Sequence, residues 1–400
     1  MKDTKICVIG LGYIGLPTAS LLGTKGYKVH GVDVSEHVVK TINEGKIHIV
    51  EPDLDIMVKS AVNVGNLKAG LEPVEADIFI IAVPTPFKDD YQPDLSYVES
   101  ATQLISPFIK PGNLVILEST SPVGTTDEVV ARILKQNGHD TDKDVFVAHC
   151  PERVLPGRIL IELVENDRIV GGINPLATEK AVEFYKAFVR GEVLSTDSRT
   201  AEMAKLTENS SRDVSIAFAN ELSLICDQEG INVWELISLA NRHPRVNILN
   251  PGPGVGGHCI AVDPWFIVAR SPKYAKLIKT ARLVNDSKPQ WVIDKVKSKA
   301  EKFKNPVIGC LGLAFKADVD DLRESPAVNI VRRLINDNVG EILISEPNLE
   351  LHKEFNLLPC EEVIRRSDII LLLVDHREFK GLKTIELNEK ILIDTRGIIQ

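Results

Sequence analysis

The chain has 400 residues, a length that predicts two or three domains rather than one small module. Hydrophobic residues make up 44% and charged residues 26%, close to the average of globular proteins, which excludes collagen-like, low-complexity and wholly disordered chains. With 56 Asp and Glu against 47 Lys and Arg, the net charge of −9 disfavours a broadly basic protein that binds nucleic acid.

The predicted elements alternate between short Ile- and Val-rich runs and longer helical patterns, as in βαβ units around a buried parallel sheet. Strands are expected at Lys5–Ile9, Lys28–Val32, Ile78–Val83, Leu114–Leu117 and Val145–His149. Helical patterns dominate the middle of the chain, at Ala201–Gln228, Val233–Asn241 and Tyr274–Phe303. A helical segment is therefore expected after the first sheet.

From Asn305 the sequence repeats its own beginning in outline. NPVIGCLGLAFK matches KICVIGLGYIGL in pattern, SDIILLLVDH matches ADIFIIAVPTP, and NEKILIDTRG matches GNLVILEST. We therefore predict an α/β protein with two Rossmann-like, doubly wound parallel-sheet domains joined by a helical central region. The expected domains are 1–195, 196–303 and 304–400.

Two features of the chain indicate where the protein works. Glycines interrupt the apolar N-terminal stretch, so no signal peptide is expected, and the run Ile369–Val374 is far shorter than the ~20 residues of a membrane span. The six cysteines are scattered without CxxC spacing, which fits a reducing compartment and gives no zinc pattern. We expect a soluble, cytoplasmic protein with no metal site and no membrane partner.

The first predicted strand runs into a glycine-rich turn. Gly10, Gly12 and Gly15 form GLGYIG, and Asp33 follows 18 residues later at the end of the second strand. This spacing is typical of a dinucleotide site, in which the glycines let a pyrophosphate approach a helix N-terminus and the acid binds the ribose. Because Asp33 would repel a 2′-phosphate and no Arg directly follows it, NAD is expected rather than NADP. A purely structural turn is the alternative.

Hydroxyl side chains follow two further predicted strands. VPTP (83–86) and ESTSPVGTT (118–126) lie where an open α/β sheet places its ligand crevice. Thr85, Thr120 and Thr126 are therefore candidate cofactor contacts, and ordinary hydroxyl-bearing turns are the alternative.

Three further clusters suggest reactive or binding chemistry. Cys259 lies in the glycine-rich segment 250–266, which is expected to be a loop, with His258 and Asp263 beside it. It is either a nucleophile or an inert buried thiol.

Lys205, Asn209 and Arg212 share one face of a predicted helix, either lining a site or forming a solvated stripe. Lys316 and Arg323 follow the opening turn of the second sheet and either contact a nucleotide or lie exposed.

Taken in order, the motifs resemble the nucleotide-sugar 6-dehydrogenase family, the group related to UDP-glucose dehydrogenase. They are GLGYIG, VPTP, STSPVGTT, PERVLPG, KLTENSSRD, GVGGHC with Asp263, and FKADVDDLRESPA, and they span essentially the whole chain. The resemblance implies an N-terminal NAD-binding domain, a central dimerisation domain that carries the nucleophile loop, and a C-terminal UDP-binding domain.

The resemblance also implies a four-electron, NAD-dependent oxidation of a sugar C6 alcohol to a carboxylate. Cys259 matches the nucleophile that traps the aldehyde as a thiohemiacetal. Lys205 matches the lysine that assists deprotonation of the alcohol and stabilises the oxyanion, and Asn209 would bind the same oxygen. Asp263 would orient the lysine or the hydrolytic water, and Glu152 and Thr120 match positions that help to hold that water.

Substrate and cofactor contacts follow from the same resemblance. Besides Lys205 and Asn209, the positions implied for the UDP-sugar are Arg153, Val154, Arg212, His243, Arg245, Gly256, Phe315 and Lys316. Arg245 looks like the arginine that reaches a neighbouring subunit, which implies a homodimer or a higher homo-oligomer. The positions implied for NAD, besides the fingerprint, are Tyr13, Ile14 and Arg323.

Two departures from the UDP-glucose branch bear on the substrate. Pro156 stands where that branch has a second glutamate, and Val262 stands where it has a lysine. Both favour an N-acetylated hexose. The expected substrate is UDP-N-acetylmannosamine, used for surface polysaccharide or glycan assembly, with UDP-N-acetylglucosamine left open. UDP-glucose oxidation, a two-electron β-hydroxyacid dehydrogenase and a non-catalytic NAD sensor are the competing hypotheses.

Overall fold

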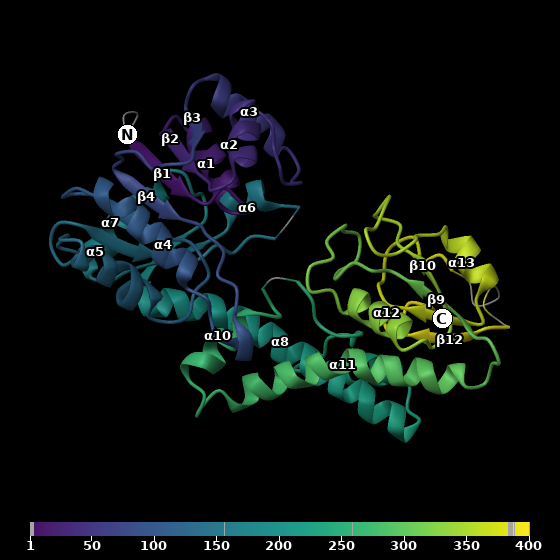
Figure 1. Ribbon diagram of the computed structural model, residues 1–400. Coiled ribbons are helices and arrows are strands. Elements are labelled where there is room, and N and C mark those ends of the chain that lie inside the picture. Colours follow the sequence, from purple (N-terminus) through teal and green to yellow (C-terminus); the bar gives the residue numbers. More distant parts are fainter. Residues whose placement is uncertain (1–3, 156, 258, 383–386, 388, 400) are drawn as a thin grey trace. The chain divides into compact units, whose positions relative to one another are not determined.

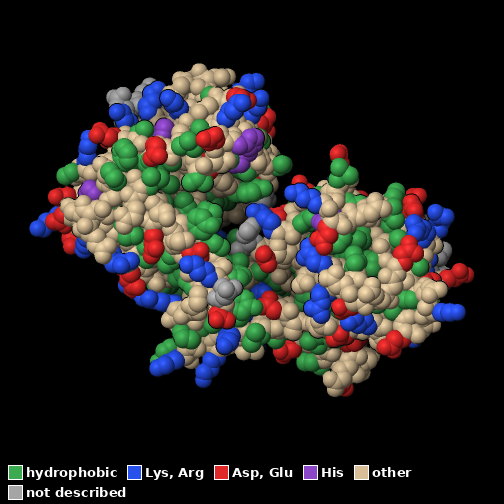
Figure 2. All heavy atoms as spheres, in the orientation of Figure 1, with side chains coloured by type: hydrophobic (Ala, Val, Ile, Leu, Met, Phe, Trp, Pro, Cys, Tyr) green, Lys and Arg blue, Asp and Glu red, His purple; other side chains and the backbone are tan. Residues whose placement is uncertain are grey.

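The computed structural model describes residues 4–155, 157–257, 259–382, 387 and 389–399 (Figure 1). The chain divides into two compact units. The first comprises Met1–Glu208 with Trp265–Arg270, and the second comprises Asn209–Pro264 with Ser271–Gln400. Over the face shown in Figure 2, acidic and basic side chains are interspersed, so that face carries no broad surface of one sign.

The first unit is built on an eight-stranded sheet in the order β3-β2-β1-β4-β5-β6-β7-β8. Its strands are β1 (Lys5–Ile9), β2 (Lys28–Val32), β3 (Leu67–Gly70), β4 (Ile78–Ile81), β5 (Leu114–Leu117), β6 (Phe146–His149), β7 (Arg168–Gly172) and β8 (Val193–Asp197). Neighbouring strands are parallel except β6 and β7, which are antiparallel. The order of the first five is the one in which dinucleotides bind at the strand ends.

Helices cover both faces of this sheet, because its central strands are apolar on both sides. In β1, Ile6 and Val8 belong to one apolar core, while Cys7 and Ile9 belong to the other. The helices are α1 (Gly15–Thr24), α2 (Glu36–Asn43), α3 (Leu54–Asn63), α4 (Ser96–Ile105), α5 (Arg132–Gln136), α6 (Ile159–Glu165) and α7 (Pro175–Lys186). Short turns Asp89–Tyr91 and Ser106–Phe108 are 3-10 helical, and Thr126–Ala131 forms a π-helical turn before α5.

The second unit contains a four-stranded, fully parallel sheet in the order β10-β9-β11-β12. Its strands are β9 (Val307–Leu311), β10 (Glu341–Ser345), β11 (Ile369–Leu372) and β12 (Ile391–Asp394), and its sheet helices are α12 (Pro326–Asn336) and α13 (Cys360–Arg366). The helical region comprises α8 (Ser198–Glu229), which begins in the first unit, then α9 (Val233–Ala240) and α11 (Lys276–Ala300). Apolar residues of α11 such as Val292 and Val296 share a core with this sheet.

The two Rossmann-like sheets and the helical region confirm the predicted fold class. The prediction named no strand at β3, β7, β8 or β10 and did not anticipate the reversal at β7. It was also wrong about the end of the glycine-rich segment, because α10 (Asp263–Arg270) begins inside it. Pro264 fits the first helical turn, where its missing N–H leaves no bond unmade. None of the described helices combines the length and apolar character needed to cross a bilayer.

Candidate active site

The turn between β1 and α1 leaves one glycine open to a ligand. A Cβ on Gly10, whose φ is +90°, would lie 2.6 Å from the carbonyl oxygen of Ala82, and one on Gly15 would lie 1.8 Å from that of Gly10. A Cβ on Gly12 would meet nothing within 4 Å. The N-cap residue Ile14 makes no side-chain capping bond, so the first N–H groups of α1 suit an anion. The turn therefore fits a dinucleotide pyrophosphate.

Asp33 is held at the end of β2 beside this turn. Its Oδ2 accepts a hydrogen bond from the N–H of Leu11 (3.1 Å) and its Oδ1 accepts one from the N–H of Ser35 (3.0 Å). The side chain is half-buried, so the carboxylate is fixed and still reachable by ribose hydroxyls. Tyr13, exposed, and Ile14, half-buried, lie on the same turn.

The three predicted threonines fall into two groups. The hydroxyl of Thr85 donates to the carbonyl oxygen of Thr120 (2.5 Å), which joins the turns after β4 and β5. Thr126 is fully buried, and both its N–H and its hydroxyl donate to Oε1 of Glu202 (2.7 Å each). Burial raises the pKa of Glu202 to about 7, despite these bonds and one from Gly124. Nothing in the sequence pattern distinguished Glu202 from the other polar residues of its helix.

Glu152 lies in a buried ion-pair cluster. Its Oε2 accepts from Nη1 of Arg168 (2.6 Å), and its Oε1 accepts from the N–H of Arg153 (2.7 Å). Burial, together with the nearby Glu152, raises the pKa of Glu118 to about 7, while the Tyr185 hydroxyl donates to Glu118 (2.7 Å). Neither Arg168, on β7, nor Glu118, directly after β5, was a predicted site residue, because the sequence gives no signal that a charged residue at such a position is buried.

The PERVLPG segment places two predicted substrate residues near this cluster. Arg153 is half-buried, and its guanidinium donates to Glu208 (3.2 Å) and to the carbonyl oxygen of Asp167 (3.0 Å). Val154 is half-buried. Pro156, one of the two departures from the UDP-glucose branch, lies outside the described residues.

Helix α8 carries the predicted polar stripe and brings one member to the thiol loop. Nδ2 of Asn209 donates to Oδ2 of Asp263 (2.5 Å), across 54 residues of sequence. Asp263 is buried at the start of α10, and its N–H donates to the carbonyl oxygen of Cys259 (2.8 Å). Lys205, one turn before Asn209, is half-buried, whereas Arg212 is exposed.

Cys259 differs from the other five cysteines in its accessibility. It is exposed, while Cys360 is intermediate and the remaining four are buried. Burial raises the pKa of Cys7 to about 11 and those of Cys150 and Cys310 to about 12, so these thiols stay protonated. The most exposed thiol is therefore the one on the glycine loop. His258 lies outside the described residues.

The glycines before Cys259 let the loop lie against the opening turn of the second sheet. A Cβ on Gly256 would lie 2.9 Å from Cβ of Phe315, and one on Gly257, whose φ is +84°, would lie 2.9 Å from the Phe315 ring. The N–H of Gly257 donates to the carbonyl oxygen of Arg323 (3.1 Å), whose guanidinium is paired with Asp321. The structure thus brings three predicted site positions, Gly256, Phe315 and Arg323, together.

The remaining predicted substrate residues are on the surface of the second unit. Lys316 is exposed beside Phe315, and His243 and Arg245 are exposed in the segment after α9. The N–H of Arg245 donates to Nδ1 of His243 (3.3 Å), which fixes the turn but leaves the arginine side chain at the surface.

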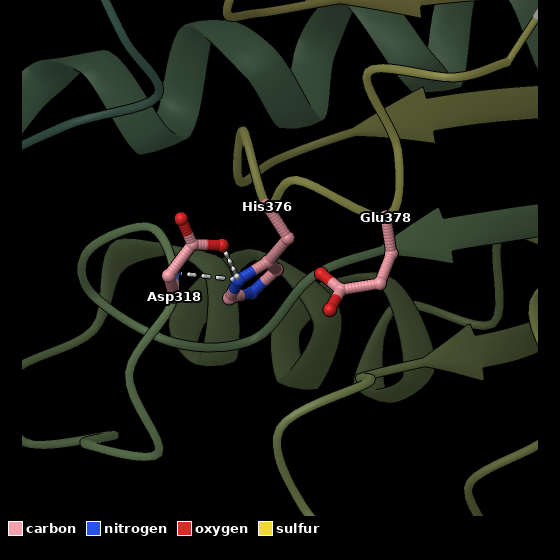
Figure 3. A group of neighbouring side chains, drawn as sticks. All are labelled: Asp318, His376 and Glu378. Carbon is pink, nitrogen blue, oxygen red and sulfur yellow. Dashed lines mark hydrogen bonds and ion pairs between the residues drawn. The ribbon is translucent and has the colours of Figure 1, made fainter.

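Metal-ligating side chains gather at one place among the described residues, at Asp318, His376 and Glu378 (Figure 3). Nδ1 of His376 accepts a hydrogen bond from the N–H of Asp318 (2.9 Å), and Nε2 faces Glu346 (3.1 Å). Both ring nitrogens are therefore engaged within the protein, and the lone pair that a metal ion would need is already used.

Sequence comparisons match the whole domain series. Residues 4–189 match the NAD binding domain of the UDP-glucose/GDP-mannose dehydrogenase family, residues 199–287 its central domain and residues 309–400 its UDP binding domain. The chain therefore belongs to this family. It is accordingly an NAD-dependent nucleotide-sugar dehydrogenase, as the motifs predicted.

Individual relatives cover nearly the full length. The chain is 57% identical to an NDP-N-acetyl-D-galactosaminuronic acid dehydrogenase of Ralstonia nicotianae, over 98% of this chain and 96% of that one. It is 55% identical to the UDP-N-acetyl-D-mannosamine dehydrogenase of Yersinia pestis over 100% of both chains. The solved structure of the UDP-N-acetyl-mannosamine dehydrogenase from S. aureus, 42% identical, covers 99% of this chain and 96% of its own with a TM-score of 0.89.

Proposed function

We propose that this protein oxidises UDP-N-acetyl-D-mannosamine at C6 to UDP-N-acetyl-D-mannosaminuronate, with two equivalents of NAD reduced per sugar. The observation that carries the proposal is the hydrogen bond from Asn209 to Asp263, four residues after Cys259. It joins two predicted catalytic segments that are 54 residues apart, beside the exposed thiol. Full-length relatives named for this substrate support it.

In the first oxidation, the chain supplies charge at the sugar oxygen. The Lys205 ammonium assists loss of the C6 hydroxyl proton and stabilises the oxyanion, and the Asn209 amide donates to the same oxygen. A cation worth ~3 kcal/mol at that oxygen corresponds to about a hundredfold in rate. The product of this step is the C6 aldehyde.

In the second oxidation, the chain holds the carbon covalently. The Cys259 sulfur adds to the aldehyde carbon and the carbonyl oxygen takes a proton, giving a thiohemiacetal that can donate hydride. Its oxidation gives a thioester, and one water then cleaves the C–S bond, which releases the carboxylate and restores the thiol. Asp263 orients Lys205 or this water, and Glu152 and Thr120 help to hold the water.

NAD supplies the hydride acceptor for both oxidations. The turn at Gly10, Gly12 and Gly15 with the N-terminus of α1 would hold its pyrophosphate, and Asp33 would hold the adenosine ribose. Further contacts proposed from the family pattern are Tyr13, Ile14, Thr85, Thr126 and Arg323.

The remaining assignments are part of the same proposal. The UDP-sugar would contact Arg153, Val154, Lys205, Asn209, Arg212, His243, Arg245, Gly256, Phe315 and Lys316. Arg245, exposed after α9, would reach the site of a second copy, which makes the protein a homodimer or a higher homo-oligomer. The domain limits are 1–195, 196–303 and 304–400. A cytoplasmic location fits the six cysteines, which are scattered along the chain without CxxC spacing.

The test is an assay of purified protein with counting of NADH. UDP-N-acetylmannosamine and its C2 epimer UDP-N-acetylglucosamine are compared side by side, and we expect two NADH per sugar and preference for the manno epimer. The Cys259→Ser variant should lose the second oxidation. A stoichiometry of one in the parent, with full activity retained in Cys259→Ser, would instead support the two-electron hydroxyacid dehydrogenase.

A second candidate substrate comes from the relatives at 57% and 56% identity, both named NDP-N-acetyl-D-galactosaminuronic acid dehydrogenases. The galacto-configured UDP-N-acetylhexosamine therefore belongs in the same assay. If its kcat/KM exceeds that of UDP-N-acetylmannosamine, the chemistry stands and the assigned substrate changes.

A further inference from the structure

A stripe of buried polar side chains lines the contact between helices α8 and α11. On α8 the stripe consists of Asp213, Asn220 and Ser223, and on α11 of Arg282, Asn285 and Lys288. All six are at most 7% exposed. Helix pairs usually bury apolar residues, since a polar group taken out of water costs free energy unless it finds a partner.

The stripe is tied together by direct bonds between the two helices. Nη1 of Arg282 donates to Asp213 (2.5 Å), and Nδ2 of Asn285 donates to the same carboxylate (2.8 Å). Nδ2 of Asn220 donates to the side-chain oxygen of Asn285 (2.8 Å). One turn along, Nζ of Lys288 donates to the Ser223 hydroxyl (2.6 Å). These bonds fix the orientation of Asn220 and Arg282.

Two members of the stripe also reach out to the loop that carries the thiol. Oδ1 of Asn220 accepts a buried hydrogen bond from the N–H of Gly252 (2.9 Å), seven residues before Cys259. Nη1 of Arg282 lies 3.4 Å from the carbonyl oxygen of Ile260, the residue after Cys259. The two contacts therefore hold the loop on both sides of the thiol.

The first contact fixes the Asn220 side chain, because both ends of its carboxamide are bonded. Its amide nitrogen is used on Asn285 and its oxygen on Gly252, so the carboxamide cannot turn without breaking both bonds. The loop itself contains Gly254 and Gly257 at positive φ, and glycines leave its backbone with many alternative conformations. The hydrogen bond from Gly252 to Asn220, which lies outside the loop, therefore selects one of these backbone conformations.

From these contacts we infer that Asn220 and Arg282 are positioning residues for the Cys259 thiol, acting through Gly252 and Ile260. The inference rests on the proposed function, in which the thiol must capture the aldehyde before it escapes. Loss of an anchor then lowers capture and leaves the first oxidation in place, because Lys205 and Asn209 are not part of the stripe.

The test compares Asn220→Ala with Ser223→Ala in the full-length protein. Ser223 is the matched control, since it is buried on the same helix face and bonds across the same contact but is not bonded to the loop. For Asn220→Ala we expect the NADH per sugar to fall from two toward one, with the aldehyde trapped by semicarbazide, and capture to drop on the order of tenfold. Ser223→Ala should keep a value of two.

A second measurement works without turnover. Amide hydrogen exchange in peptides covering Asn250–Gly257 should accelerate in Asn220→Ala and not in Ser223→Ala, with thermal melts confirming that both variants are folded. If Asn220→Ala does not fold, the nearly isosteric Asn220→Leu takes its place, because it fills a similar volume but can neither accept from Gly252 nor donate to Asn285.

The outcomes separate the two proposals. Two NADH per sugar and unchanged loop exchange in Asn220→Ala, matching Ser223→Ala, would overturn the positioning role. Two NADH per sugar in Cys259→Ser would instead overturn the covalent mechanism on which the role depends.

Discussion

In the β1–α1 turn, one glycine is required for folding and another leaves space for a ligand. Gly15 has no room for a methyl group, because its Cβ would lie 1.8 Å from the carbonyl oxygen of Gly10. At Gly12 the same methyl would enter open space, at the place where the pyrophosphate is expected. The two glycines look equivalent in sequence, but Gly15 is needed for the packing of the turn and Gly12 for the approach of the pyrophosphate.

We therefore expect opposite results from two alanine variants. Gly12→Ala should keep its melting temperature and raise the KM for NAD by roughly tenfold, since the methyl holds the pyrophosphate away from the backbone. Gly15→Ala should fail to give folded protein. Calorimetry and initial-rate kinetics check this, and a stable Gly15→Ala protein with normal NAD binding would contradict it.

The buried carboxyl of Glu118 predicts a pH effect on stability. Its pKa is raised from 4.5 to about 7 in the folded state, chiefly by burial. Below pH 4.5 the group is protonated in both states and costs nothing, whereas as the pH rises toward 7 only the unfolded state ionises freely, so stability is lost. Glu118→Gln removes that loss and still accepts from Tyr185.

The measurement is urea unfolding of the variant and the parent from about pH 4.5 to pH 8. Relative to the parent, Glu118→Gln should gain up to about 3 kcal/mol across this range, the equivalent of the pKa shift. Glu99→Gln is the control for the loss of a carboxyl group, because Glu99 is an exposed glutamate of the same unit. A flat difference for Glu118→Gln would refute the raised pKa.

At the scale of elements, the thiol loop takes its shape from the segment against which it packs. A Cβ on Gly257 would push the ring of Phe315, whereas a Cβ on Gly230, at a similar positive φ of +68°, would meet nothing within 4 Å. Alanine at either position costs about 1–2 kcal/mol of backbone strain. Of the two substitutions, only alanine at Gly257 displaces Phe315, which is proposed to contact the UDP-sugar.

Gly257→Ala and Gly230→Ala should therefore lose similar stability but differ in kinetics. Gly257→Ala should raise the KM for the UDP-sugar and leave the KM for NAD unchanged, while Gly230→Ala should change neither. Adding Phe315→Leu to Gly257→Ala should recover part of the loss, because a smaller side chain makes room. Equal KM values in both variants would mean that the ring is not part of the site.

Elements and motifs were predictable to different degrees. Strands such as β1 and β5 follow from apolar runs that any parallel sheet requires, and Gly10 with Asp33 follows from a fixed spacing. The partners of the site were not predictable. The pairing of Glu152 with Arg168 and that of Thr126 with Glu202 depend on which strands and helices become neighbours, and a single sequence does not record that.

At the scale of the whole molecule, the two sheets share one hydrogen-bonding arrangement. In each, a backbone N–H donates to an acidic residue that follows the neighbouring strand, but the two acidic residues differ in their accessibility. In the first, the N–H of Leu11 donates to the acidic residue that follows β2, Asp33 (3.1 Å). In the second, the N–H of Leu313 donates to the acidic residue that follows β10, Glu346 (2.6 Å). The internal repeat seen in the sequence is thus a repeat of hydrogen bonding as well.

The carboxylates of Asp33 and Glu346 differ in their exposure and in their hydrogen-bond partners. Asp33 is half-buried and open to a ligand, whereas Glu346 is 4% exposed and faces the buried ring of His376 (3.1 Å). Although burial opposes ionisation, the hydrogen bonds from His376 and from the N–H of Leu313 hold the pKa of Glu346 below its usual range. Ribose hydroxyls therefore have no access to it, and the second sheet cannot bind a dinucleotide in the manner of the first.

We accordingly expect one NADH bound per chain. Isothermal titration calorimetry of the protein with NADH should give a stoichiometry of one, and both oxidations would then draw NAD in turn through the single site on the first sheet. Asp33→Ala should weaken that binding by roughly tenfold or more, since two N–H groups lose their fixed acceptor and the ribose loses its own. Glu346→Gln should leave NADH affinity unchanged, because its partners are internal to the second sheet. Two sites per chain, or a site that survives in Asp33→Ala and is lost in Glu346→Gln, would mean that the second sheet binds the dinucleotide and that the burial of Glu346 does not prevent it.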